Sequence, residues 1–161
     1  MRVLGIEGTA WAASAACYDD SDDTVFIESD PYQPDSGGIH PREAAEHMGE
    51  AIPKVIDRVL AHTAATVDDD AADTATSDAD SPNPYGIDCV AFSQGPGLGP
   101  CLRTVGTAAR AAAQALNVPL VGVNHMVAHL EIGRHRSGFE SPVCLNASGA
   151  NAHLLGFHNG R

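Results

Sequence analysis

Residues 3–28 read VLGIEGTAWAASAACYDDSDDTVFIE and contain three short apolar runs separated by small or acidic residues. The runs are Val3 to Glu7, Trp11 to Tyr18 and Thr24 to Glu28, with Gly8-Thr9 and the acidic cluster Asp19 to Asp23 between them. Short runs bounded by turn-forming residues are typical of antiparallel strands joined by tight turns. The stretch therefore predicts a three-stranded meander.

A long amphipathic helix is expected after the meander. Pro41 suits a first helical position, and apolar residues from Ala44 to Leu60 recur every three or four positions, which places them on one helix face. The following residues, 66–84, are rich in Asp, Ala, Thr and Ser and hold too little apolar mass to form a core. We predict that residues 66–84 are an acidic, solvated surface insertion.

The second half of the chain alternates apolar runs with helical patterns. Buried strands are expected at 87–92 and 118–123, and helices at 101–116 and from 124 to about 135. Asn124 is a good N-cap for the latter helix. Two further strands, 142–148 and 153–157, are expected around a Gly-Ala-Asn turn.

This order of elements predicts the fold class. A βββαβαβα order followed by a hairpin is that of an α/β lobe of ribonuclease H type, as found in the actin, Hsp70 and sugar-kinase architecture. We assign residues 1–136 to this lobe, including the insertion, and residues 142–161 to the first hairpin of a truncated second lobe. Because the architecture normally pairs two lobes around a nucleotide cleft, the second lobe is expected to be missing.

The composition limits the classes of partner. The 161 residues include 21 acidic and 9 basic side chains, a formal net charge of −12, and Lys54 is the only lysine. Such a surface disfavours nucleic-acid binding by charge alone, and it suits a cytosol with a high salt concentration, so we expect a halophile. The four cysteines show no C-x-x-C spacing and are expected to be reduced thiols of a cytoplasmic protein with no membrane span.

A pair of histidines is the first candidate site. His125 and His129 are four residues apart in the helix predicted from residue 124, so their imidazoles share a helix face and lie within reach of one cation. Helical histidine pairs are also commonly solvated or partly buried without a metal. The position just after a buried strand favours a ligand site, because strand carboxyl ends face the ligand crevice in open α/β sheets. No Glu follows His125, so the general base of an H-E-x-x-H protease is absent.

Three turns could contact an anionic ligand. The strand-to-helix loop that contains Gly95, Gly97 and Gly99 would let backbone amides approach a phosphate or adenylate, although a rigid turn with two prolines is an equal alternative. The Gly8-Thr9 turn and the turn 148–151 carry hydroxyls that could also face an anion. Each of these two could instead be only a turn.

Four segments in this order resemble one protein family. They are Gly5-Ile6-Glu7-Gly8-Thr9-Ala10, GGIHPREAA at 37–45, AFSQGPGLGP at 91–100 and GVNHMVAH at 122–129. Together they resemble the tRNA N6-threonylcarbamoyladenosine synthase family. This family comprises the archaeal and eukaryotic catalytic subunit of the KEOPS complex and bacterial TsaD, formerly called O-sialoglycoprotein endopeptidase. The resemblance covers nearly the whole chain but only the N-terminal part of a family member. The acidic composition indicates a haloarchaeal source.

The resemblance implies an activity and a set of site residues. Family members transfer threonylcarbamoyl from threonylcarbamoyl-AMP to N6 of adenosine 37 in tRNAs that read ANN codons. By resemblance, His125 and His129 bind one divalent metal ion, iron or zinc, and Asn146 stands where the family has a tyrosine that can join the metal. The substrate would be held by the turn after the sixth strand, the glycine loop and the first hairpin, with the residues Ala147, Ser148, Gly149, Ala150, Gly95, Gly97, Gly99 and Thr9.

Two functional readings follow from the missing lobe. The first is a transferase lobe that is inactive alone, because the family's last metal ligand, an aspartate, lies in the second lobe. The alternative is a non-catalytic dimerisation or scaffold lobe of the tRNA-modifying complex. The expected partners are KEOPS-type subunits including a small kinase or ATPase, tRNA through that complex, and a complementing C-terminal chain.

Overall fold

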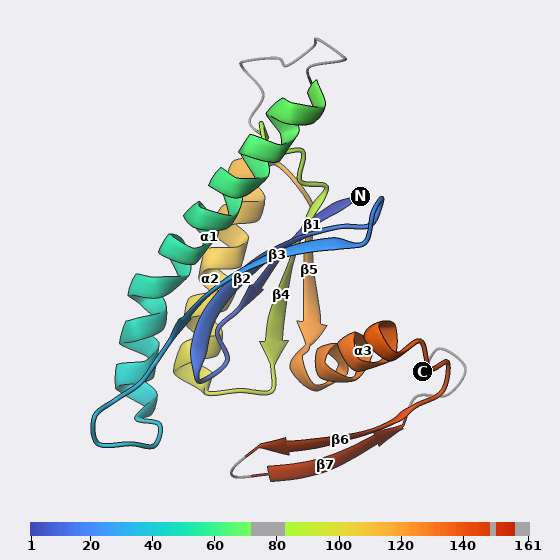
Figure 1. The fold of residues 1–161 in the computed structure, drawn as a ribbon. Helices are drawn as coiled ribbons and strands as arrows, with labels where there is room; N and C mark the ends of the chain where they lie inside the picture. Colours follow the sequence, from blue (N-terminus) through green and yellow to red (C-terminus); the bar gives the residue numbers. More distant parts are fainter. Residues whose placement is uncertain (72–82, 149–150, 157–161) are drawn as a thin grey trace.

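The three apolar runs at the start of the chain form an antiparallel meander, as the sequence predicts. The computed structural model describes residues 1–71, 83–148 and 151–156. The meander strands are β1 (Arg2–Glu7), β2 (Ala12–Asp19) and β3 (Thr24–Pro31). β1 also pairs in parallel with β4 (Cys89–Gly95), and β4 pairs in parallel with β5 (Leu120–Asn124), which gives the sheet order β3-β2-β1-β4-β5 (Figure 1).

Two helices, α1 (Pro41–Ala71) and α2 (Gly99–Leu116), pack on one face of this sheet (Figure 1). Leu4 and Ile6 of β1 point into this layer, where they join the apolar stripe of α1, including Met48 and Ile52. Because side chains alternate along a strand, Gly5 points to the opposite face. One face of the sheet is therefore sealed by helices, and the other is available for a site.

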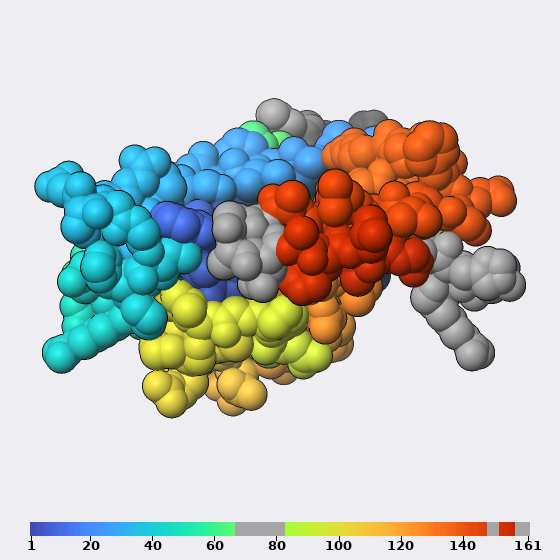
Figure 2. Space-filling view, turned by 90° about the horizontal axis from the view of Figure 1, so that it is seen from below, coloured from blue at the N-terminus to red at the C-terminus, as the bar shows by residue number. Residues whose placement is uncertain are grey.

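The third helix and the hairpin complete the described fold. α3 (His125–Ser137) begins directly after β5, and Leu130 is its one buried residue in the described chain. β6 (Val143–Ser148) and β7 (Asn151–Gly156) form a separate antiparallel hairpin. Figure 2, seen from below, shows this hairpin at the surface beside α3. Among the described residues, none of the helices is long and apolar enough to cross a membrane.

The structure corrects the predicted start of the surface insertion. Residues 66–71, predicted to open the surface insertion, are the last residues of α1. No Gly or Pro interrupts the chain between Lys54 and Ala71, and the alanines in this stretch favour helix, so the helix continues past its apolar stripe. Residues 72–82 of the predicted insertion lie outside the described residues.

Candidate metal site

The two histidines lie together at the start of α3. The Asn124 side chain caps this helix by accepting hydrogen bonds from the backbone amides of Met126 (2.9 Å) and Val127 (3.2 Å). The cap fixes the first turn, and the Nε2 atoms of His125 and His129 lie 3.1 Å apart with their rings nearly perpendicular. Two nitrogens bound to one metal at ~2.0–2.1 Å are separated by ~2.9–3.4 Å for octahedral to tetrahedral angles. In the structure the two nitrogens are within hydrogen-bond distance of each other, and their spacing is also one that two ligands of a single cation would have.

A carboxylate from β1 orients the first of these rings. Glu7 lies at the carboxyl end of β1, and its Oε2 is 3.1 Å from His125 Nδ1. A carboxylate that accepts Nδ1–H leaves the Nε2 lone pair free for a metal, and metal-binding histidines commonly have such a partner. The sequence places Glu7 only at the end of the first apolar run and gives no sign of this contact, which spans 118 positions.

The surroundings of Glu7 keep it ionised. Burial raises the pKa of its carboxyl group, but hydrogen bonds from Ser93 and Thr9 and the nearby His125 outweigh burial and lower the pKa below its ordinary value of 4.5. One of these bonds is from the Thr9 amide to Glu7 Oε1, at 2.6 Å. Glu7 is therefore a charged acceptor for His125 at neutral pH.

The described residues bring together two candidate metal ligands and not more. Among residues 1–71, 83–148 and 151–156, no group of three or more His, Cys, Asp or Glu side chains could hold a metal. Asn146, a predicted site residue, has its Nδ2 3.6 Å from Met126 Sδ and so lies against the first turn of α3. Two imidazole nitrogens suit iron or zinc, but stable sites need three or four protein ligands, so further donors are required.

The glycine loop packs directly on the first hairpin. The Leu98 amide donates to the Thr9 carbonyl at 2.9 Å, and a Cβ added to Gly97 would lie 2.7 Å from Thr9 Cβ. Only glycine fits this approach. Gly95 has a φ of +140°, whereas Gly99 is the first residue of α2 and has open space around its Cα.

The substrate residues predicted around these turns differ in accessibility. Thr9 is only 5% exposed, and its amide donates a hydrogen bond to Glu7. Thr9 therefore holds the carboxylate that contacts His125. No side chain caps the amino end of α2, and its second residue, Pro100, has no N–H. Ala147 is exposed on β6, and Ser148 ends that strand. Gly149 and Ala150 lie outside the described residues.

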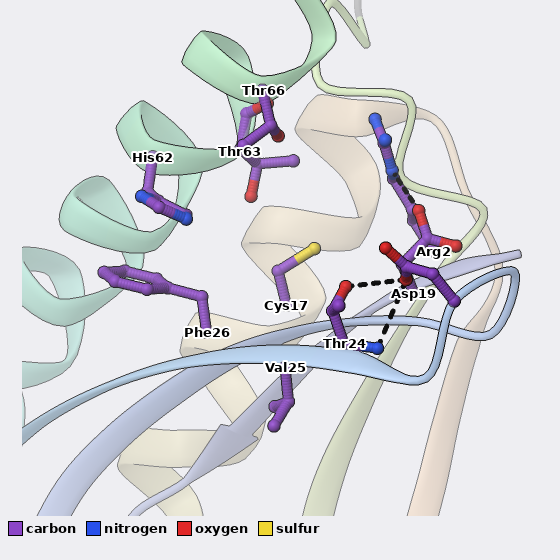
Figure 3. Close-up of a pocket in the computed structure, with 10 residues that line it drawn as sticks. Arg2, Cys17, Asp19, Thr24, Val25, Phe26, His62, Thr63 and Thr66 are labelled. Atoms are coloured by element: carbon purple, nitrogen blue, oxygen red, sulfur yellow. Dashed lines mark hydrogen bonds and ion pairs between the residues drawn. The ribbon is translucent and has the colours of Figure 1, made fainter. Parts of the chain in front are cut away.

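A hollow that the sequence did not predict lies at the amino end of β1 (Figure 3). Its charged and aromatic side chains interact with each other: Arg2 Nε lies 2.6 Å from Asp19 Oδ2, and the rings of Phe26 and His62 stack at 3.7 Å. Hydrogen bonds from Ser21 and from Arg2 lower the pKa of Asp19 well below its usual range. The Phe26–His62 stack joins α1 to the meander, and the Arg2–Asp19 pair links β1 to β2. The hollow is remote from Glu7, which lies at the other end of β1.

Comparison with known proteins decides the family. The TsaD model, described as tRNA N6-adenosine threonylcarbamoyltransferase, matches residues 23–161. The chain belongs to this family. The family predicted from the four sequence segments is thus confirmed, and His125, His129 and the glycine loop lie within the matched range.

Similar proteins are much longer than this chain. It is 66% identical to a probable bifunctional tRNA threonylcarbamoyladenosine biosynthesis protein of Haloquadratum walsbyi, over 98% of this chain and 27% of that protein. A protein of the same name from Halobacterium salinarum is 68% identical, over 100% of this chain and 27% of that protein. The tRNA N6-adenosine threonylcarbamoyltransferase of Methanocella arvoryzae is 48% identical, over 99% of this chain and 43% of that protein. The chain thus spans about a quarter of the bifunctional relatives' length.

A solved structure confirms the fold class. YeaZ from Pseudomonas aeruginosa matches with a TM-score of 0.60, over 99% of this chain and 62% of that one, at 14% sequence identity. This likeness confirms the ribonuclease H-like fold predicted from the order of strands and helices.

Proposed function

We propose that this chain is the metal-binding N-terminal lobe of a tRNA threonylcarbamoyl transferase. The complete enzyme would transfer threonylcarbamoyl from threonylcarbamoyl-AMP to N6 of adenosine 37 in tRNAs that read ANN codons. The proposal is carried by the geometry of the histidine pair in a chain of this family. The Nε2 atoms of His125 and His129 lie 3.1 Å apart, and the Glu7 carboxylate contacts Nδ1 of His125. The names of its relatives support tRNA modification.

Each part of the site would have a separate role. When bound, the cation would position the carbamoyl group and polarise its carbonyl. His125 and His129 would hold the cation, and Glu7 would keep the His125 ring oriented by accepting Nδ1–H. The loop at Gly97, fixed to the Thr9 carbonyl, would form a rigid wall of the adenylate cleft.

The lobe would be inactive alone. Two imidazoles are an incomplete donor set, and a chain with a net charge of −12 offers little attraction for a tRNA backbone. A second lobe would complete the site, and KEOPS-type partners including a small kinase or ATPase would bring the tRNA.

A specific observation favours the alternative of a non-catalytic dimerisation or scaffold lobe. Val143, Leu145 and Leu154 of the hairpin are 65–74% exposed, and a cluster of exposed apolar side chains is typical of a protein-binding surface. This alternative does not require the histidine pair. A histidine substitution should therefore abolish tRNA modification if the lobe is catalytic and leave it intact if the lobe is only a scaffold.

A chimera tests the proposal. This chain replaces the matching segment of the Halobacterium salinarum relative, and threonylcarbamoylation of transcript tRNA is measured at high salt. We expect activity from the chimera, none from this chain alone, and a loss of activity when His129→Ala is introduced. His135→Ala, on the same helix but outside the pair, is the control and should remain active. Turnover by the isolated chain, or an active His129→Ala chimera, would contradict the proposal.

A further inference from the structure

The last turn of α3 is tied to the turn between β2 and β3 through one carboxylate. Asp23 Oδ1 lies 2.7 Å from His135 Nε2 and accepts a hydrogen bond from the Tyr18 hydroxyl at 3.1 Å. Asp23 Oδ2 lies 3.8 Å from a guanidinium nitrogen of Arg136, and the rings of Tyr18 and His135 meet edge to face. We call these four residues the α3 anchor. The contact between Asp23 and His135 joins positions 112 residues apart in the chain.

The backbone of Asp23 separates the role of its carboxylate from the needs of the turn. Asp23 has a φ of +57°, in the left-handed region, where residues other than glycine are strained and aspartate and asparagine are tolerated best. Glycine would adopt this φ without strain but would bring no carboxylate. The hydrogen bond with His135 is the main reason that the pKa of Asp23 lies below its ordinary value, so the carboxylate is ionised at neutral pH. Asp23 therefore offers α3 a charged acceptor at a position where the backbone alone favours glycine.

α3 is held on the sheet mainly at its two ends. At its first turn, His125 Nδ1 lies 3.1 Å from the Glu7 carboxylate of β1, and at its last turn the α3 anchor reaches the β2–β3 turn. Between these ends, Leu130 is the one buried residue of α3 in the described chain. A hollow of about 430 Å³, lined by residues of β2 and β5 and by Val127 and Ile132, lies along the same stretch of helix. The middle of α3 therefore does little to fix the angle of the helix.

The angle of α3 controls how Glu7 meets His125. His135 lies ten positions after His125, which is ~15 Å along the axis at ~1.5 Å per residue. If the last turn moved by ~4 Å, a rigid helix pivoting at its first turn would tilt by ~15°. The spacing of His125 and His129 on the helix would stay the same, but the His125 ring would turn relative to Glu7, which belongs to the sheet. At 3.1 Å this contact is already near the upper end of N–H···O distances, ~3.2 Å, so a small tilt is enough to weaken it.

We propose that Asp23 is a positioning residue for the candidate metal site: through His135, it holds α3 at the angle at which Glu7 reaches His125. The importance of this role rests on the proposed function, because it concerns the same histidine pair. The His135 and Asp23 side chains are 44% and 52% exposed, and exposed ion pairs are weak. We therefore expect a change of about two- to fivefold in metal affinity rather than a loss. A chimera with His135→Ala should accordingly remain active.

Long-range proton–nitrogen NMR spectra of the metal-free chain at high salt test the positioning role, because they show which ring nitrogen of His125 carries the proton. We expect the Nδ1–H tautomer, held by Glu7, in the wild type and a mixture of tautomers in Asp23→Gly, which suits the φ of the turn and lacks the carboxylate. Asp23→Asn keeps an oxygen acceptor for His135 and should rescue the wild-type signal. Asp20→Asn is the matched control, because Asp20 belongs to the same turn but pairs with the amino terminus.

Zinc titration of the same variants measures the consequence for the site. Asp23→Gly should bind Zn²⁺ about two- to fivefold more weakly than wild type, and Asp20→Asn should bind it equally well. An unchanged His125 tautomer in Asp23→Gly, or an equal change in Asp20→Asn, would overturn the positioning role. So would a wild type whose His125 does not carry its proton on Nδ1, because the α3 anchor would then have no contact to preserve. A wild type that binds no Zn²⁺ would contradict the proposed function alone, and the tautomer comparison would still decide the role of Asp23.

Discussion

Replacing Gly97 by alanine should destabilise this lobe, because the glycine loop leaves no room for a side chain. A Cβ at position 97 would lie 2.7 Å from Thr9 Cβ and 2.9 Å from the Thr9 carbonyl oxygen. Relaxed carbon contacts are ~3.5–4.0 Å, and the carbonyl belongs to the backbone and cannot rotate away. The same carbonyl accepts the 2.9 Å bond from the Leu98 amide, so relief of the clash would stretch that bond.

The neighbouring glycine provides the control for the size of this effect. A Cβ at Gly99 has no heavy atom within 4 Å. Both substitutions restrict the unfolded chain equally, which stabilises each variant by about 0.4–1 kcal/mol. Overpacking costs about 1–3 kcal/mol, so Gly97→Ala should be less stable than Gly99→Ala by about this amount.

Urea unfolding at a fixed high salt concentration measures the difference, with Trp11, the only tryptophan, as the fluorescent probe. The midpoint should fall for Gly97→Ala with the m-value unchanged, since the folded structure stays compact. Equal midpoints for the two variants would refute the close packing of the loop on the Thr9 turn.

Three further substitutions test the site and the core. Glu7→Gln should weaken Zn²⁺ binding about 10–100-fold by isothermal titration, while Glu131→Gln, which changes a carboxylate paired within α3, should not. The pKa of Glu7 in the folded chain lies below 4.5, so its contribution to stability is complete above pH 4.5 and is lost as the pH falls through the folded pKa. The urea midpoints of wild type and Glu7→Gln should therefore converge in acid. Asn124→Ala should cost about 1 kcal/mol and speed amide hydrogen exchange at the start of α3, and an unchanged exchange rate there would contradict the cap. Ile52→Ala, fully buried, should cost about 2–5 kcal/mol in urea unfolding, and a loss below 1 kcal/mol would contradict its place in the core.

The strands and helices of this fold could be predicted because local patterns decide them. The meander runs are bounded by Gly8-Thr9 and by the aspartate cluster, and Pro41 marks the start of α1. The end of α1 could not be predicted from its apolar stripe, because alanine propensity favours continuing the helix to Ala71. Likewise β4 runs on to Gly95, because pairing with β5 includes residues assigned to the loop.

The candidate site was predictable only in part. The spacing of His125 and His129 fixes their common face, since it depends on one helical turn. The role of Glu7 depends on the order β1-β4-β5, which brings the carboxyl end of β1 near the start of α3. No local signal reports that contact. A carboxylate at the end of one parallel strand and a histidine after another would be the pattern to search for.

Metal binding by the two imidazoles is the most direct test of this account. The chain is treated with chelator, dialysed and titrated with Zn²⁺ at high salt, alongside His129→Ala and a His125→Ala, His129→Ala double variant. We predict one ion per wild-type chain, strongly weakened binding in the single variant and none at this site in the double variant. Equal binding by wild type and double variant would show that the pair at 3.1 Å is not a metal site.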